Sequence, residues 1–185
     1  MTCCPLGNWS GYWQTHYLVI ASLNTLTQKR SQRIRSVVAM IAINLTRLKA
    51  KCIEHRLSGN DAAVFPRLVI VVEEGASATV IERTTSGTDA LLSVPLTELR
   101  VQRGGRLTFA AVQQLGSKAW QLGSLVTDVA QEANLSVSLV GLGGEYARVR
   151  TDCTMSGRGA NGDLLAAYFG DGDQTLDFRT FQHHN

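Results

Sequence analysis

The residues of this sequence that could do chemistry most directly are its cysteines and a pair of adjacent histidines, His183 and His184. Adjacent residues of a strand point to opposite faces, so the two histidines are poorly placed to bind one metal ion. Cys153 has no histidine beside it in the sequence, which favours a small buried residue over a nucleophile. The cysteines form no Cys-x-x-Cys pair and no cluster at zinc spacing; they are Cys3, Cys4, Cys52 and Cys153. We predict no metal site, no disulfide framework and a reducing, cytoplasmic compartment.

Two glycine-containing segments have the composition of ligand-binding loops. Residues 141–144, Gly-Leu-Gly-Gly, follow an extended stretch, but a nucleotide-binding loop needs a helix after it to offer backbone amides to phosphate. Residues 145–150 alternate like another strand, so a turn is the favoured interpretation. The segment Asp171-Gly172-Asp173 resembles part of a calcium loop, yet no further oxygen ligands follow at a recognised spacing. We predict a hairpin-type turn there.

Acidic residues leave open a carbohydrate-active β-solenoid enzyme, which needs carboxylates clustered on one face. Five aspartates are available: Asp152, Asp163, Asp171, Asp173 and Asp177. Four of them lie in or near turns and their spacing shows no common face, so we assign no catalytic residue and expect no enzyme activity. Trp120 could stack on a ring, but a packing role is favoured. The identity of any cofactor-binding residue stays open.

Composition divides the chain into two parts. Residues 1–57 hold eight basic residues and one acidic residue, whereas residues 58–185 hold ten basic and 14 acidic residues, so the net charges are +7 and −4. The whole chain is 44% apolar and 18% charged, which is typical of a globular domain and excludes wholesale disorder. No apolar run reaches the roughly 18 residues that a membrane span needs. We place a boundary between residues 57 and 58.

The first part predicts a basic amphipathic helix, of unclear origin, over residues 28–57. Its apolar residues recur at intervals of three and four: Ile34, Val37, Val38, Ile41, Leu45, Leu48, Cys52 and Ile53. Lysines and arginines surround this stripe. A helix packed on a core is the favoured interpretation, and a binding module for anionic lipid or nucleic acid is the alternative.

The second part predicts short strands separated by turns. The candidate strands span residues 68–72, 79–83, 107–112, 135–140, 146–150, 164–169 and 176–181. Several alternate strictly, and the run from Leu68 to Val72 reads as a strand buried on both faces. The strands often start at short, regular intervals, and two gaps between their starts are longer. This pattern indicates a sandwich, a barrel or a solenoid, and periodicity does not choose among the three.

A series of motifs in fixed order resembles one known family. The series begins with Pro-Arg-Leu-Val-Ile-Val-Val-Glu-Glu-Gly-Ala at 66–76 and Ala-Thr-Val-Ile-Glu at 78–82. It continues with residues 141–144 and Arg148, Ser-Gly-Arg-Gly-Ala at 156–160, residues 164–168, and 172–184. Over roughly residues 61–185 the sequence resembles the SufB/SufD family of iron-sulfur cluster assembly proteins. The final run is more similar to SufD than to SufB.

The resemblance implies a mainly β fold, a right-handed parallel β-helix over residues 58–185 with glycines at its corners. It implies a SufD-like, non-catalytic scaffold component of the SufBCD complex, in which SufB and the ATPase SufC are the partners. The complex handles the iron-sulfur cluster, and we expect no cofactor bound by this chain itself. We expect neither nucleic acid nor a membrane span as a partner.

The sequence also departs from the family. Residues 1–57 do not resemble it, and after His184 the further rungs, the strands that pair SufD with SufB and the SufC-binding region expected of the family do not follow. We therefore expect a solenoid fragment that is truncated at its C-terminal end, and we transfer no cluster-site residue to this chain.

Overall fold

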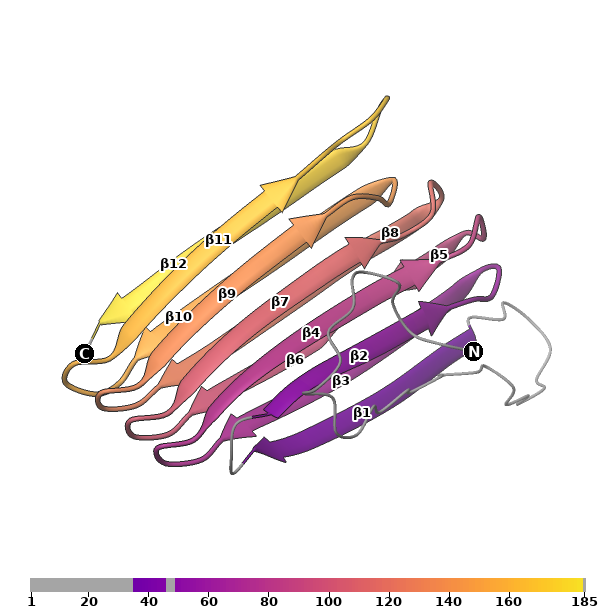
Figure 1. Cartoon of the computed structure of the whole chain (residues 1–185). Coiled ribbons are helices and arrows are strands. Elements are labelled where there is room, and N and C mark those ends of the chain that lie inside the picture. Colours follow the sequence, from indigo (N-terminus) through magenta and orange to yellow (C-terminus); the bar gives the residue numbers. More distant parts are fainter. Residues whose placement is uncertain (1–34, 46–48, 185) are drawn as a thin grey trace, which may run out of the picture.

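The computed structural model describes residues 35–45 and 49–184, and every regular element within them is a β-strand (Figure 1). The strands are β1 (Arg35–Leu45), β2 (Lys49–Leu57), β3 (Ala62–Val72), β4 (Ser77–Ser86), β5 (Leu91–Ser93), β6 (Leu96–Val101), β7 (Arg106–Gln114), β8 (Ala119–Val129), β9 (Asn134–Gly141), β10 (Tyr146–Met155), β11 (Asn161–Tyr168) and β12 (Thr175–His184). Each of the seven strands predicted from the sequence lies within one of these strands, except that the prediction for β11 runs one position beyond its end. All strand pairs are parallel.

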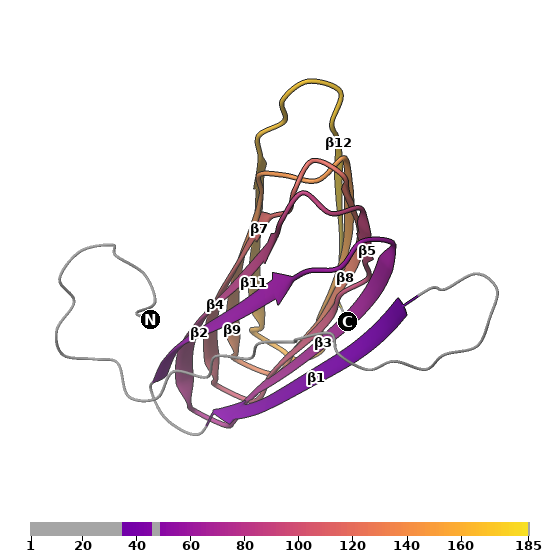
Figure 2. The ribbon, with the colours of Figure 1, turned by 90° about the vertical axis from the view of Figure 1, so that its right-hand side faces the viewer.

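The strands form two parallel sheets, and the chain alternates between them. Sheet A has seven strands. Six of them follow the order β1, β3, β5, β8, β10, β12, and the seventh, β6, also pairs with both β3 and β8. Sheet B has five strands in the order β11, β9, β7, β4, β2. Figure 2 looks along the stack and shows the sheets as two facing walls, with β4, β7 and β9 on one side and β5 and β8 on the other. The fold is a parallel β-solenoid of about five turns, as the resemblance implied.

The register reveals a structural repeat. In sheet A, Ala62 pairs with Leu91, and Leu91 pairs in turn with Ala119. In sheet B, Arg106 of β7 pairs with Asn134 of β9 at nearly the same separation along the chain. Each turn of the solenoid, or rung, therefore contributes strand residues to both sheets. Equivalent residues of successive rungs lie directly above one another.

Alternation along each strand creates the core between the sheets. In β8, every second residue from Ala119 to Val129 is buried and every residue between them is exposed. The facing strand β7 directs Leu107 and Phe109 into the same space, where each is only 1% exposed. One continuous cluster of buried apolar side chains runs through the stack from Leu45 to Met155. Burial of this apolar surface is the main stabilising contribution to the fold.

The corners that lead from sheet A to sheet B use one repeated four-residue turn. The turns are 73–76, 102–105, 130–133 and 157–160, and in each the amide of the fourth residue donates to the carbonyl of the first at 2.8–3.1 Å. The third residue has a positive φ of 66° at Gly75, 63° at Gly104, 57° at Glu132 and 73° at Gly159. Three of these four positions are glycine, which adopts this conformation without steric cost. The amides of Gly75, Gly104 and Glu132 donate to carbonyls of the next turn at 2.9–3.1 Å, and these bonds link successive rungs.

The predicted N-terminal helix is wrong for the residues that the structure describes. Residues 35–45 and 49–57 are strands β1 and β2, which join the same two sheets as the rest of the chain. Residues 28–34 and 46–48 of the predicted helix lie outside the described residues. The run from Val37 to Leu45 is almost continuously apolar, and short apolar runs fit a buried parallel strand as well as a helix. Pairing with β3 and β4 decides between the two. The boundary between residues 57 and 58 stays a prediction.

Candidate interaction surface

The outward side of sheet A carries large aromatic, aliphatic and charged side chains. We call the outward residues of β8, β10 and β12 the sheet A face. Its apolar and aromatic members are Trp120, Leu122, Val126, Tyr146 and Phe181, and its charged members include Arg148, Arg150, Asp152, Asp177 and Arg179. The alternation that buries the inner residues of each strand is what brings these residues to the outside.

Aromatic and aliphatic side chains remain exposed on this face. Trp120 is 45% exposed and stacks on Tyr146 of the next strand, with ring centroids 5.1 Å apart and an interplanar angle of 29°. The two residues are direct neighbours in the register. Leu122 and Val126, further along β8, are 42% and 44% exposed. Together they form an apolar patch that water solvates poorly.

Ion pairs border the patch on β10 and β12. The guanidinium of Arg148 lies 3.5 Å from Asp177, and that of Arg179 lies 3.0 Å from the same carboxylate. Arg150 donates two hydrogen bonds to Asp152, at 2.8 and 2.9 Å, and its guanidinium lies 4.7 Å from the centre of the Phe181 ring. The hydrogen bonds from Arg150 lower the pKa of Asp152, and the same bonds raise the pKa of Arg150. Both groups therefore stay ionised over a wide pH range.

The outward side of sheet B has a different character. In the register, Thr79 of β4, Thr108 of β7 and Ser136 of β9 lie in one row. The next outward row of these strands contains Ile81, Ala110 and Ser138. Other outward positions of sheet B carry Arg83, Arg106 and the exposed Leu165, but the outward residues of β4, β7, β9 and β11 include no aromatic ring. Tryptophan and tyrosine, which lie on the sheet A face, are among the residues most enriched at protein interfaces. The sheet A face is therefore the stronger candidate for a partner surface.

The glycine motifs singled out in the sequence are turns. Residues 142–144 form the corner between β9 and β10, and a strand follows them rather than a helix. Residues 171–173 lie in the turn between β11 and β12, where the side-chain oxygen of Gln174 accepts a hydrogen bond from the Asp171 amide at 2.9 Å. Both segments are turns, as predicted, but the hairpin type predicted for 171–173 is wrong, because β11 and β12 belong to different sheets and do not pair with each other.

The structure does not bring the candidate chemical groups together. Cys153 is fully buried in the core, as predicted. His183 and His184 occupy successive positions of β12 and are both exposed. Within residues 35–45 and 49–184, no group of three or more His, Cys, Asp or Glu side chains could hold a metal ion. The described part of the chain also contains no helix that could span a membrane.

The five aspartates lie on different surfaces. Asp152 and Asp177 share the sheet A face, each with an arginine partner, whereas Asp163 lies on sheet B. Asp171 and Asp173 are in a turn. The structure therefore gives no support to the carbohydrate-active enzyme. Trp120 stacks on Tyr146. It therefore packs against another side chain, but it does so on the outer surface and not in the core.

Sequence reasoning missed the apolar patch of this surface because it missed β8. The buried positions of this strand include the polar residues Gln121 and Thr127, while its exposed positions include Trp120, Leu122 and Val126. This inverts the usual pattern of apolar residues inside and polar residues outside. β8 pairs in register with β10, a strand whose alternation the sequence did reveal. A search for a strand one turn of the solenoid before β10 could therefore have located β8.

These features define a class of protein: a parallel β-solenoid whose outer face carries aromatic side chains and arginines. The chain belongs to the SufBD core family: the family model described as "SUF system FeS cluster assembly, SufBD core domain" matches residues 55–185.

Curated relatives agree with this membership. An iron-sulfur cluster assembly SufBD family protein of Mycobacterium leprae is 32% identical over 124 residues, which cover 66% of this chain and 31% of the relative. SufBD family proteins of Staphylococcus haemolyticus and of Staphylococcus aureus strain MRSA252 are 24% and 25% identical over 124 residues, covering 66% of this chain and 27% of each relative. The chain thus spans less than a third of the length of these relatives. No solved structure gave a significant match.

Proposed function

We propose that this chain acts as a SufD-like, non-catalytic scaffold component of an iron-sulfur cluster assembly complex in the cytoplasm. Its proposed partners are a SufB-like paralogue and a SufC-like ATPase, and the cluster is the cargo of the complex rather than a cofactor of this chain. Membership of the SufBD core family supports the assembly role. We also propose that the solenoid is right-handed, as nearly all parallel strand crossovers are.

The sheet A face is the observation that carries the scaffold role. It combines exposed aromatic and aliphatic side chains on β8 with arginines on β10 and β12, which is the composition of protein interfaces. The rungs hold these side chains in fixed rows, because every strand of the face is paired in register with its neighbour. A rigid surface loses little conformational entropy when a partner binds. We therefore propose that the SufB-like partner binds the sheet A face.

The test is co-expression of the tagged chain with cognate SufB and SufC, followed by a pull-down scored for stoichiometric recovery of each partner. The variants Leu122→Glu and Val126→Glu place a charge in the apolar patch without touching the core, because both side chains point outward. We expect each to reduce recovery of SufB at least about tenfold. The matched control is Ile81→Glu, an outward residue of sheet B that is 37% exposed, and it should leave recovery unchanged.

Two results would contradict the proposal in different ways. A folded chain that recovers neither partner would remove the scaffold role and leave the family membership in place. Equal losses for Leu122→Glu and Ile81→Glu would keep the partner but would show that it does not bind the sheet A face specifically. Circular dichroism of each variant, which should retain the β-sheet spectrum, separates lost binding from lost folding.

A further inference from the structure

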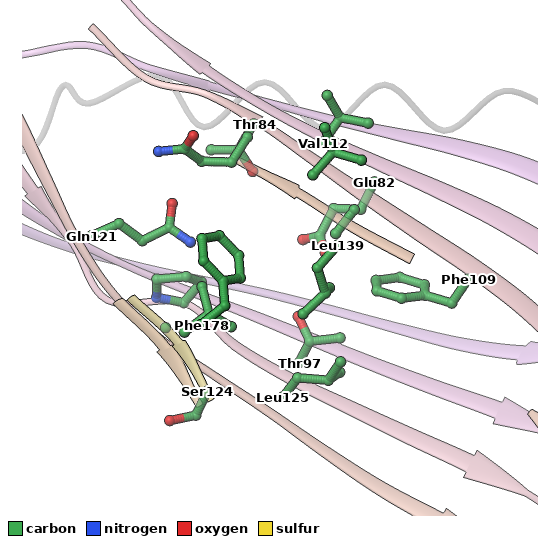
Figure 3. A pocket seen from close by; sticks show the side chains of 16 residues that line it. Glu82, Thr84, Thr97, Phe109, Val112, Gln121, Ser124, Leu125, Leu139 and Phe178 are labelled. Carbon is green, nitrogen blue, oxygen red and sulfur yellow. The ribbon is translucent and has the colours of Figure 1, made fainter. Parts of the chain in front are cut away.

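A small, partly open cavity lies between the two sheets of the solenoid, and a few polar side chains interrupt its mostly apolar wall. It has a volume of about 60 Å³, and its wall includes Glu82 and Thr84 of β4, Thr97 of β6 and Gln121 of β8. Apolar side chains complete the wall, among them Phe109, Leu125, Leu139 and Phe178. Figure 3 shows Glu82 and Thr97 on one side of the Phe178 ring and Gln121 on the other side of it in this view. The inside of a β-solenoid is normally apolar, so this concentration of polar groups needs an explanation.

Gln121 is the key residue of the cavity. Its side chain is only 8% exposed, and its Oε1 atom has no hydrogen-bond partner among the described residues. Its neighbour in the sheet ladder, Ser93, is fully buried and its Oγ atom also has no partner in this part of the chain. A buried polar group without a partner is unfavourable, and such groups in native proteins are usually satisfied by an ordered water molecule.

Gln113, the other buried glutamine of the cavity wall, has hydrogen-bond partners for both its Nε2 and its Oε1 atom. The Nε2 atom of Gln113 donates to the Gly143 carbonyl at 2.7 Å, and its Oε1 atom accepts from the amides of Leu142 and Gly143 at 3.2 and 3.1 Å. Gln113 therefore has a structural role in the corner after β9. Gln121 has no such role in the described residues, although it is similarly buried.

Glu82 adds an acceptor on the opposite wall. Its side chain is 9% exposed, and Oε1 lies 3.0 Å from Nε2 of His55, which is 2% exposed. His55 belongs to β2, which pairs with β4, so it approaches the carboxylate of Glu82 from that side. The cavity lies on the side of β7 and β8. A ligand in the cavity would be able to donate a hydrogen bond to this carboxylate.

We propose that this cavity binds a cluster of about two water molecules, anchored by the side chains of Gln121 and Glu82. The cavity has room for about two waters, and its wall offers them the polar side chains of Glu82, Thr84, Thr97 and Gln121. Water also fits whichever way the amide of Gln121 is oriented, because it both donates and accepts hydrogen bonds. A purely donating ligand such as ammonium fits only one orientation. The site is independent of the scaffold role, since it lies on the inner side of the sheets.

The test is a crystal structure of the full chain at about 1.6 Å resolution, with a second crystal pressurised with xenon. We expect an electron-density peak at about 2.7–3.2 Å from the Gln121 amide and another within the same distance of Glu82. Xenon occupies dry apolar cavities, so we expect no xenon peak. Absence of a water peak near Gln121, or a xenon atom in the cavity, would overturn the proposal.

Two variants test the anchoring residue. Gln121→Leu removes the polar group and keeps a side chain of similar size, so the peak nearest residue 121 should disappear. The control is Thr151→Val: Thr151 is 1% exposed and its Oγ1 atom also has no partner in the described residues, but it does not line the cavity. Both water peaks should remain in the control. A water at an unchanged position in Gln121→Leu would contradict anchoring by Gln121. If that variant does not fold, the density of the unmodified chain still decides the question.

Discussion

The strands of the middle rungs and of the last rung direct alternate side chains inward and outward in the same way, but their inward side chains have different environments. In β8 every inward residue is buried, whereas in β11 the inward residues Leu164 and Ala166 are only partly buried and Tyr168 is exposed. The difference arises because β9 and β8 each pair with a strand on both sides, while β11 and β12 each pair with one. The comparison teaches that the neighbouring rungs determine how deeply the inner face of a strand is buried.

Aromatic residues show the contrast most clearly. Phe109 of β7 is 1% exposed, whereas Phe169, directly after β11, is 80% exposed. Phe178 of β12 has an intermediate environment, since it packs against the core and stacks on Tyr168 with ring centroids 5.6 Å apart. The free energy that each ring contributes should follow this order, because it scales with the apolar area removed from water.

The largest expected effect comes from truncating an aromatic ring in the middle of the stack. Phe109→Ala should lower the free energy of unfolding by about 3–5 kcal/mol, because it removes a fully buried ring and enlarges the cavity beside it. Phe178→Ala in the last rung should cost about half as much, because its ring is only partly buried. Urea unfolding followed by circular dichroism measures both values. Equal costs would show that the last rung is as well packed as the middle.

A close backbone contact at a middle corner gives the next effect. A Cβ atom on Gly143 would lie 2.1 Å from the carbonyl oxygen of Leu115 in the preceding rung. Gly143→Ala must therefore push two rungs apart, and we expect a loss of about 1–3 kcal/mol in the free energy of unfolding. Gly87→Ala is the control, because a Cβ atom there meets no atom within 4 Å. Similar stabilities for the two variants would argue against this tight stacking.

The repeated corner turn offers a stabilising change. Glu132 is the residue with a φ of 57° at a position where three other rungs have glycine. A left-handed conformation is unfavourable for a side-chain-bearing residue, so Glu132→Gly should raise the free energy of unfolding by about 1 kcal/mol. Thermal unfolding should show a higher midpoint for the variant. An unchanged or lower midpoint would mean that the turn holds Glu132 without strain.

The smallest effect concerns the ion pair of Arg150 and Asp152 on the sheet A face. The pKa of Asp152 is lower in the folded chain than in the unfolded chain, so its contribution to stability is present at neutral pH and is lost as the pH falls through the folded-state pKa. Asp152→Asn should therefore be less stable than the unmodified chain at neutral pH, and the difference should shrink on acidification. Urea unfolding at several pH values measures this.

The control for this pair is Asp163→Asn. Asp163 lies on the outward side of sheet B and makes no ion pair with the residues that the structure describes. Its substitution should give no comparable pH-dependent difference. A difference for Asp152→Asn that grows toward low pH would have the wrong sign for an ion pair.

The sequence predicted the strands best where apolar and polar residues alternate in the usual sense, as in β9 and β10. It failed for β8, where Gln121 and Thr127 are inside and Trp120 is outside. It also failed for β1 and β2, whose apolar residues have a spacing that fits a helix, and only their pairing with β3 and β4 shows that they are strands. The local sequence of a strand does not reveal which strand it pairs with, because each partner lies a whole turn of the solenoid away along the chain.

The repeat itself was present in the sequence in two forms. The long gap between the predicted strand starts at 107 and 135 equals one turn of the solenoid, because Leu107 pairs with Leu135. The turns Glu73-Glu74-Gly75-Ala76 and Gly157-Arg158-Gly159-Ala160 recur at the same corner, but the intervening turn at 130–133 has no glycine and hides the period. The sheet A face could not be predicted, because Trp120 and Tyr146 are distant in the sequence and meet only through the register.

Hydroxyl-radical footprinting of the chain, free and bound to cognate SufB, tests the central claim most directly, because it reports the solvent exposure of individual side chains. In the free chain we expect Trp120 and Phe169 to react and Phe109 to be protected. In the complex, Trp120, Tyr146 and Phe181 should become protected while residues on the outward side of sheet B do not change. Reaction of Phe109 at the rate of Phe169 would contradict the closed core, and unchanged reactivity of Trp120 in the complex would contradict the sheet A face as the partner surface.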